Sequence, residues 1–252
     1  MAFFDADLPV NNSKLPELEI LGKSVQVEEK KGILYLSKNG ITIELTGVFK
    51  ETKTGIDGTV VQLVCKTGDD EPTWDISGLE YDFDKLFTQI GDGKLDKVIE
   101  EMFKKKDLIW GSNFDDKLFG FKGDDEVVGW SGNDWLNGGL GRDKLVGKMG
   151  DDTFVFDVAL KSGNIDKIAD FNVNRDTIAL KQKIFTEFEK GNLHKAELTI
   201  GKTAEGSEAQ IIYRKGKGHL SYDADGDGPG EALKFANMQK NKDINHDDFL
   251  VI

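Results

Sequence analysis

Residues 111–155 read GSNFDDKLF, GFKGDDEVV, GWSGNDWLN, GGLGRDKLV and GKMGDDTFV when the chain is divided every nine residues. The sixth position of each unit is aspartate and the eighth is apolar. The aspartates are Asp116, Asp125, Asp134, Asp143 and Asp152; the apolar residues are Leu118, Val127, Leu136, Leu145 and Phe154. Self-similarity at a fixed period is typical of a solenoid, in which stacked copies bury a continuous core that one copy cannot bury alone.

The front half of each unit combines glycine with carboxylates. Glycine permits the left-handed and close-approach backbone of a tight turn, and such turns leave main-chain carbonyls pointing inward. A column of stacked aspartates would repel itself unless a cation lay between the layers. Calcium accepts carbonyls and carboxylates together in irregular cages, whereas magnesium demands near-ideal octahedra. The repeats contain no His or Cys, which argues against zinc and copper. The repeats therefore predict calcium binding.

The units match the nonapeptide G-G-x-G-x-D-x-U-x, so this stretch resembles the RTX (repeats-in-toxin) proteins. The resemblance implies a short parallel β-roll in which two units make one turn, so that unit n stacks on unit n+2. It also implies about three or more calcium ions between the stacked loops. The oxygen ligands that it implies are drawn from Gly111, Asn113, Asp115, Asp116, Gly120, Lys122, Asp124, Asp125, Gly129, Ser131, Gly132, Asn133, Asp134, Gly138, Gly139, Leu140, Gly141, Asp143, Gly147, Gly150, Asp151 and Asp152.

Three positions qualify this resemblance. Phe114 replaces the fourth-position glycine of the first unit, which predicts a distorted first loop. Arg142 replaces a small or acidic fifth residue and removes an oxygen from the fourth unit. Family members often carry D-x-I-x-D-F after the roll, with an aspartate that caps the last loops. The stretch Asp166–Phe171 matches it, so Asp170 is either a further ligand or an ordinary aspartate at the end of a strand.

The flanking segments predict two further units, which gives domains at 1–106, 107–157 and 158–252. In the first, GILYL and ITIEL flank the turn Ser37–Gly40 and predict a hairpin, while SVQVEE and TVVQLVC predict further strands. Asp82 can cap a short helix, and Leu95–Lys106 spaces its apolar residues on one helical face. The last unit contains AQIIYR, HLSYD, EALKFANM and DDFLVI, which predict a small β-rich cap. The predicted fold class is therefore mainly β: a short parallel β-roll between a β-rich unit with one or two helices and a β-rich capping unit.

The composition excludes some functions. The formal net charge is −13, so the surface repels phosphate backbones and argues against nucleic-acid binding. Cys65 stands alone and is expected to be a small buried apolar residue. No signal peptide and no apolar stretch long enough to span a membrane is visible. The terminal DDFLVI resembles the uncleaved end of RTX proteins that a type I exporter secretes. We therefore expect a secreted or cell-surface protein of bacterial type, with calcium and a type I secretion exporter as partners.

The sequence leaves the biological role open between two alternatives. It contains neither the H-E-x-x-H of a metalloprotease nor the G-x-S-x-G of a lipase. The favoured hypothesis is a non-enzymatic surface, adhesion or matrix protein that binds extracellular polysaccharide or a cell surface. Trp110, Trp130 and Trp135 could form a sugar-binding face, although tryptophans at these repeat positions more often just cover the roll. The alternative is an extracellular glycan-active hydrolase with its site in the first domain. The turn Asp223–Gly228 imitates the start of an EF-hand loop, but Lys234 stands where the bidentate Glu is required. It is read as a solvated hairpin turn, with weak calcium binding as the alternative.

Overall fold

The structure is a computed structural model that describes Glu101 and residues 103–252 in full. Before Glu101 it describes the backbone of the strands β1 to β6. The helix expected after Asp82, residues 95–100 of the helix expected from Leu95, and the surroundings of Cys65 fall outside the described residues. Within the described part of the chain, no helix is long and apolar enough to cross a membrane.

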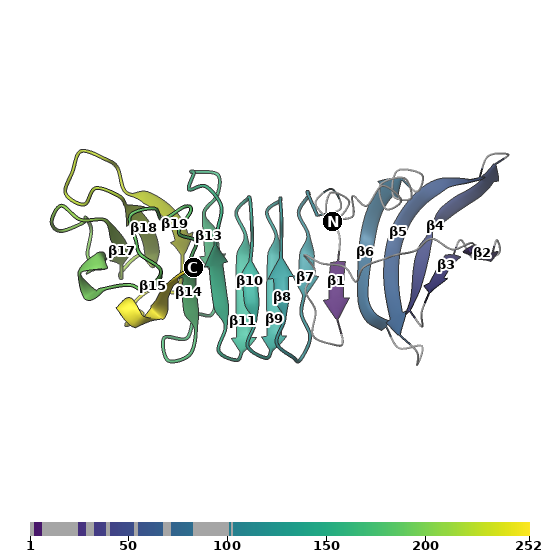
Figure 1. The fold of residues 1–252 in the computed structure, drawn as a ribbon, viewed down its shortest axis with the longest axis horizontal. Coiled ribbons are helices and arrows are strands. Elements are labelled where there is room, and N and C mark those ends of the chain that lie inside the picture. The colour runs from purple at the N-terminus through teal and green to yellow at the C-terminus, as the bar shows by residue number, and fades with distance from the viewer. Residues whose placement is uncertain are drawn as a thin grey trace.

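The centre of the molecule is a parallel β-roll made of two facing sheets. The strands of one sheet are β7 (Leu108–Trp110), β9 (Glu126–Ser131), β11 (Lys144–Met149) and β13 (Asp166–Ile168). The strands of the other are β8 (Lys117–Phe119), β10 (Trp135–Asn137), β12 (Thr153–Phe156) and β14 (Thr177–Leu180). Neighbouring strands are parallel, and the chain alternates between the two sheets, as Figure 1 shows. This confirms the predicted mainly-β fold with a β-roll.

The eighth residue of each unit fills the space between the sheets. Leu118 pairs with Leu136, which pairs with Phe154, and Val127 pairs with Leu145 in the other sheet. These five side chains are completely buried. Burial of one such side chain contributes about 1.5–3 kcal/mol, so the stacked column supplies the core that a three-residue strand lacks.

The roll begins one layer earlier than the nonapeptide pattern. β7 pairs with β9 in the same parallel register that β9 keeps with β11, so Ile109 lies beside Val127 and is completely buried. Phe103 is also completely buried and stacks on Phe121 at 5.9 Å between ring centroids. The helix predicted through Lys106 is therefore too long, because residues 103–106 form a turn and bends that serve as the loop of this first layer.

The amino-terminal strands continue one sheet of the roll. They are β1 (Phe3–Ala6), β2 (Val25–Glu28), β3 (Ile33–Lys38), β4 (Ile41–Thr52), β5 (Gly55–Thr67) and β6 (Pro72–Asp82). β2 to β6 form an antiparallel meander, and β3 and β4 confirm the hairpin expected around Ser37–Gly40. β1 pairs antiparallel with β6 and parallel with β7, which joins the meander to the roll in a single sheet (Figure 1).

The carboxyl-terminal segment extends both sheets. Its elements are β15 (Gly191–Asn192), the 3-10 turn η1 (Lys195–Glu197), β16 (Leu198–Ile200), β17 (Gln210–Arg214), β18 (His219–Asp223), β19 (Leu233–Asn237), the 3-10 turn η2 (His246–Asp248) and β20 (Phe249–Val251). β17, β18 and β19 form the expected antiparallel unit, and β19 pairs with β13. β20 leaves this unit and pairs parallel with β14 in the other sheet.

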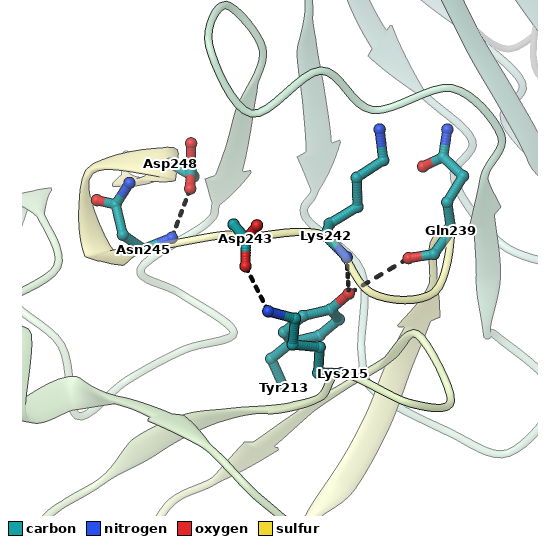
Figure 2. A network of polar contacts seen from close by, with 7 residues as sticks. All are labelled: Tyr213, Lys215, Gln239, Lys242, Asp243, Asn245 and Asp248. Carbon is teal, nitrogen blue, oxygen red and sulfur yellow. Dashed lines mark hydrogen bonds and ion pairs between the residues drawn. The ribbon is translucent and has the colours of Figure 1, made fainter.

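The long connection between β19 and β20 is fixed by the buried Tyr213. Its hydroxyl donates to the carbonyl of Gln239 at 3.3 Å and accepts from the Lys242 N–H at 3.2 Å (Figure 2). Lys215 forms an ion pair with Asp243 in the same network. The connection can therefore cross from one sheet to the other with its main chain anchored.

Candidate metal centre

The sixth-position aspartates form two ladders, one beside each set of stacked loops. In each ladder the main-chain N–H of one aspartate donates to the Oδ1 of the aspartate in the next layer. The column that contains the even-numbered units, called the even column, joins Asp107, Asp125, Asp143 and Asp166. Its N···Oδ1 distances are 2.7, 2.8 and 3.1 Å. The column that contains the odd-numbered units, called the odd column, joins Asp116, Asp134, Asp152 and Asp176. Its N···Oδ1 distances are 2.9, 3.1 and 3.2 Å. All eight side chains are buried.

The second carboxylate oxygen has a different environment. The Oδ2 atoms of Asp125, Asp134 and Asp143 are buried and accept no hydrogen bond within the described chain. A buried carboxylate oxygen without a partner is strongly unfavourable unless a cation or a proton neutralises it. These oxygens are therefore candidate metal ligands.

The first-position glycines show which other oxygens lie near these carboxylates. A Cβ added to Gly129 would lie 2.1 Å from Asp134 Oδ2 and 3.0 Å from the carbonyl oxygen of Gly147. A Cβ added to Gly120 would lie 2.4 Å from the Gly138 carbonyl oxygen and 2.8 Å from Asp125 Oδ2. Each glycine thus leaves room for a carboxylate of its own unit and a carbonyl of the next layer.

This donor set fits calcium. Within the described residues, no group of three or more His, Cys, Asp and Glu side chains could hold a metal by itself. Main-chain carbonyls must therefore complete any site, and calcium accepts carbonyls and carboxylates in one cage. The third-position residues have exposed or half-buried side chains and can contribute through their carbonyls; they are Asn113, Lys122, Ser131, Leu140 and Met149.

The loops of units two to five share one backbone conformation. Their fourth-position glycines all have positive φ: Gly123, Gly132, Gly141 and Gly150. Their second positions also have positive φ, yet only Gly139 is a glycine there; the others are Phe121 (67°), Trp130 (80°) and Lys148 (77°). The left-handed conformation costs a non-glycine residue about 1–2 kcal/mol, so the stacked arrangement imposes it on three unsuited side chains.

The first loop lacks this conformation. Neither Ser112 nor Phe114 has positive φ. Instead, the Ser112 hydroxyl lies 3.0 Å from Asp116 Oδ2 and accepts the Phe114 N–H at 3.1 Å. The Asp116 carboxylate is thus satisfied inside its own loop, in contrast to the carboxylates of units two to four.

The fifth-position residues form a second, exposed ladder. Asp115 Oδ1 accepts the Asn133 N–H at 2.7 Å, and Asn133 Oδ1 accepts the Asp151 N–H at 2.9 Å. Asp124 Oδ1 accepts the Arg142 N–H at 2.9 Å, so Arg142 keeps its main-chain place in the stack. The structure therefore brings together the fifth and sixth positions that the sequence paired. Their role as ligands remains a prediction.

Asp170 caps the odd loops at the end of the array. Its Oδ1 accepts the Gly147 N–H and its Oδ2 accepts the Lys148 N–H, both at 2.9 Å. In the first odd loop, the Gly111 N–H donates to the Val128 carbonyl at 2.7 Å instead. Both oxygens of Asp170 thus replace the missing next layer.

The turn after β18 contains further carboxylates whose metal binding stays open. Asp225 Oδ2 accepts the Gly230 N–H at 3.0 Å, and the Asp227 N–H donates to the Gly206 carbonyl at 2.7 Å. Asp223 is buried, and its Oδ1 accepts no hydrogen bond within the described chain. These contacts hold the turn against the residues before β17.

Burial makes the metal-free carboxylates weak acids. Burial, helped by the neighbouring Asp143 and Asp107 carboxylates, raises the pKa of Asp125 to about 8. Burial and the Asp152 and Asp116 carboxylates raise the pKa of Asp134 to about 7. The same causes raise the pKa values of Asp143 and Asp152 to about 6 and that of Asp166 to about 8. The columns therefore retain protons near neutral pH unless a cation displaces them.

Comparison with known proteins identifies the repeats. Residues 106–136 and 128–154 match the RTX calcium-binding nonapeptide repeat, of which 4 copies are recognised. This segment is therefore an array of RTX repeats, and its cofactor is calcium. One similar solved structure is the solution structure of the AlgE6R3 subunit from the Azotobacter vinelandii mannuronan C5-epimerase, with 22% identity and a TM-score of 0.38. The match covers 58% of this chain and 78% of that one. No curated protein matches the sequence.

The sequence analysis missed three members of the two columns. Asp107 follows three lysines without any glycine, so nothing in the local pattern marks it as a sixth position. Asp166 and Asp176 lie 23 and 24 residues beyond their partners instead of 18. The available signal was the apolar residue two positions later, which is Ile109, Ile168 or Ile178.

Proposed function

We propose that this protein is a calcium-responsive RTX protein that works outside the cell, where calcium completes the folding of its roll. The supporting observation is that the buried Oδ2 atoms of Asp125, Asp134 and Asp143, in the two columns, accept no hydrogen bond from the residues that the structure describes. Without calcium these carboxylates must hold protons or repel one another, which destabilises the closed roll as the pH rises towards neutral. With calcium, the free energy of binding becomes free energy of folding.

Calcium concentration is the reason for placing this function outside the cell. Extracellular calcium-binding modules work at about 10⁻⁴–10⁻³ M calcium. A roll that stays open below this range can pass an exporter as an unfolded chain and close afterwards. Type I secretion is the route that this proposal includes.

The experiment is a calcium titration of the chelator-treated protein, followed by circular dichroism and repeated with magnesium. We expect a cooperative gain of β signal with calcium and none with magnesium, because carbonyl-rich cages suit the larger ion. An unchanged spectrum in calcium would contradict the proposal, since the roll would then be fully formed without metal.

The proposed role of the folded protein is non-enzymatic binding at a surface or in a matrix. The supporting feature is an aromatic group on the odd-loop edge: Trp110 and Trp130 contact edge to face at 6.4 Å, and Lys148 Nζ lies 5.7 Å from the Trp130 ring centre. Trp130 is 44% exposed. Exposed aromatic rings beside a cation suit the apolar faces and acidic groups of polysaccharides.

Binding to a glycan array in calcium, without turnover of the bound glycans, is the result that this role predicts. Turnover would favour the alternative, a glycan-active hydrolase with its site in residues 1–106. The side chains of that segment fall outside the described residues, apart from Glu101 and residues 103–106.

A further inference from the structure

A row of polar side chains crosses the large sheet where the roll meets the carboxyl-terminal unit. The strands β11, β13, β19, β18 and β17 are consecutive neighbours in this sheet (Figure 1). Their registers place one residue of each strand at the same level, in the order Lys144, Lys167, Asn237, His219 and Arg214. These five residues are called the cross-strand row.

The cross-strand row lies on the outer face of the sheet. On each strand the adjacent residue belongs to the hydrophobic core; these residues are Leu145, Ile168, Ala236, Leu220 and Tyr213. Successive side chains of a strand point to opposite faces of the sheet, so the row points away from the core. Lys144, Lys167 and Arg214 are exposed, and Asn237 and His219 are half-buried.

The row is positively charged, although the net charge of the protein is −13. Lys144 is neutralised at one end by its ion pair with Glu126. Lys167 and Arg214 form no ion pair with any residue that the structure describes. The row therefore presents two exposed cations without a carboxylate partner in the described chain.

Further cations surround His219 in the middle of the row. Burial, and after it the positive charges of Lys234, Arg214, Lys217 and Lys240, lowers the pKa of His219 below its ordinary value. His219 is therefore uncharged near neutral pH, and its imidazole can donate or accept a hydrogen bond between the flanking cations.

The spacing of the row fits a linear polyanion. Neighbouring strands lie about 4.7–4.9 Å apart, and Lys167 and Arg214 are three strand spacings apart. One uronic acid ring of an extended polysaccharide advances by a similar distance and has one carboxylate. Arginine binds a carboxylate with two parallel hydrogen bonds, while Asn237 and His219 provide neutral groups for ring hydroxyls between the two cations.

The acidity of the remaining molecule favours a narrow ligand. A membrane surface or a nucleic-acid duplex is wide and would bring many negative charges against the acidic surface beside the row. A single polysaccharide chain can follow the row without approaching that surface.

We propose that the cross-strand row binds an acidic polysaccharide, whose chain crosses β13, β19, β18 and β17. Lys167 and Arg214 bind its carboxylates, and Asn237 and His219 bind its hydroxyl groups. The site is separate from the Trp110 and Trp130 group. The inference rests on the proposed role in surface or matrix binding, because it gives that role a class of ligand and a second site.

The test is isothermal titration calorimetry in calcium with an oligogalacturonate too short to gel. The variant is the double substitution Lys167→Gln with Arg214→Gln. The matched control is Lys183→Gln with Lys190→Gln, which removes two exposed charges between β14 and β15 of the other sheet. We expect the row variant to bind about tenfold more weakly than the wild type and the control to bind as the wild type does.

Two further measurements make the result specific. Added sodium chloride should weaken the binding of oligogalacturonate to the wild type, because exposed charges are screened by salt. Circular dichroism in calcium should be the same for both double variants and the wild type, since all four substituted side chains are exposed.

Equal affinity of the two double variants for oligogalacturonate would overturn the inference. Tighter binding of a single-stranded oligonucleotide with the same number of charges would also overturn it. Binding of neutral malto-oligosaccharide alone, lost in Trp130→Ala, would overturn the inference but leave the proposed role intact. A wild type that binds no glycan would contradict the proposed role together with the inference.

Discussion

At the residue scale, each sixth-position aspartate in the middle of the array divides its carboxylate between two functions. Oδ1 of Asp134 accepts the Asp116 N–H at 2.9 Å and holds the register between layers. Oδ2 is buried close to Gly129 and accepts no hydrogen bond from any described residue. The first oxygen requires only an acceptor, whereas the second requires a counter-charge.

Asp134→Asn separates these two functions. The amide oxygen preserves the acceptor for Asp116, but the negative charge that attracts calcium is lost. We expect the calcium concentration at the folding midpoint to rise by at least about tenfold. The measurement is the same circular dichroism titration. Glu126→Gln is the control, since it removes one charge from the exposed ion pair with Lys144; an equal shift in both variants would contradict the argument.

Gly129→Ala tests the space beside the carboxylate. The added methyl group would lie 2.1 Å from Asp134 Oδ2 and must displace it. Overpacking of this kind costs about 1–3 kcal/mol, and calcium affinity should fall with it. Denaturant unfolding in calcium measures the cost. Gly163→Ala is the matched control, because nothing lies within 4 Å of its added Cβ. Equal stability of the two variants would show that Gly129 is not constrained.

At the element scale, the columns make the metal-free roll dependent on pH. Unfolded aspartates titrate near about 3.9, whereas burial raises the folded pKa values of Asp143 and Asp152 to about 6 and that of Asp134 to about 7. The folded state therefore binds more protons than the unfolded state between these values. Its stability is highest below about pH 4 and falls as the pH rises from about 4 to about 7, where the folded carboxyl groups have also lost their protons.

Thermal unfolding of the metal-free protein from pH 4 to pH 8 should show this loss of stability as a falling midpoint. Calcium should abolish the fall, because the cation replaces the protons on the carboxylates. A midpoint that rises with pH in the metal-free protein would contradict the assignment of these aspartates as buried acids.

The sequence predicted the elements of the roll where period and composition agreed. Glycines at the first and fourth positions, the sixth aspartate and the eighth apolar residue all repeat every nine residues from Gly120. The layers at Asp107, Asp166 and Asp176 escaped prediction, because main-chain pairing to a regular neighbour can impose the fold on a loop of different length and composition. The end of the helix expected through Lys106 is wrong for the same reason: residues 103–106 form a turn and bends, and Phe103 packs in the core against Phe121.

At the scale of the whole molecule, one hydrophobic cluster runs from Phe103 through the roll to Val251. The last strand contributes directly to it, since Phe249 pairs with Ile178 and is completely buried. The sequence DDFLVI thus has a structural function in the folded state, whatever function it has in export. Folding of the cap and folding of the roll are coupled through this strand.

Phe249→Ala measures that coupling. Truncation of a buried phenylalanine costs about 3–5 kcal/mol, and we expect the roll to require more calcium as a result. The readout is the free energy of unfolding in calcium together with the calcium midpoint. Leu250→Ala, on the half-exposed face of the same strand, should change both far less. A calcium midpoint unaffected by Phe249→Ala would show that the roll folds independently of β20.

The direction of the strands has a mechanical consequence. The strands of the roll lie across the long axis of the molecule, side by side along it (Figure 1). A force that pulls the two ends of the long axis apart would therefore load the hydrogen bonds between neighbouring strands, and these bonds would break one layer at a time. Such bonds yield at low force when they break singly. An ion bound between each pair of layers would add metal–oxygen bonds along this line of tension, so the roll should resist forced unfolding better in calcium than in its absence.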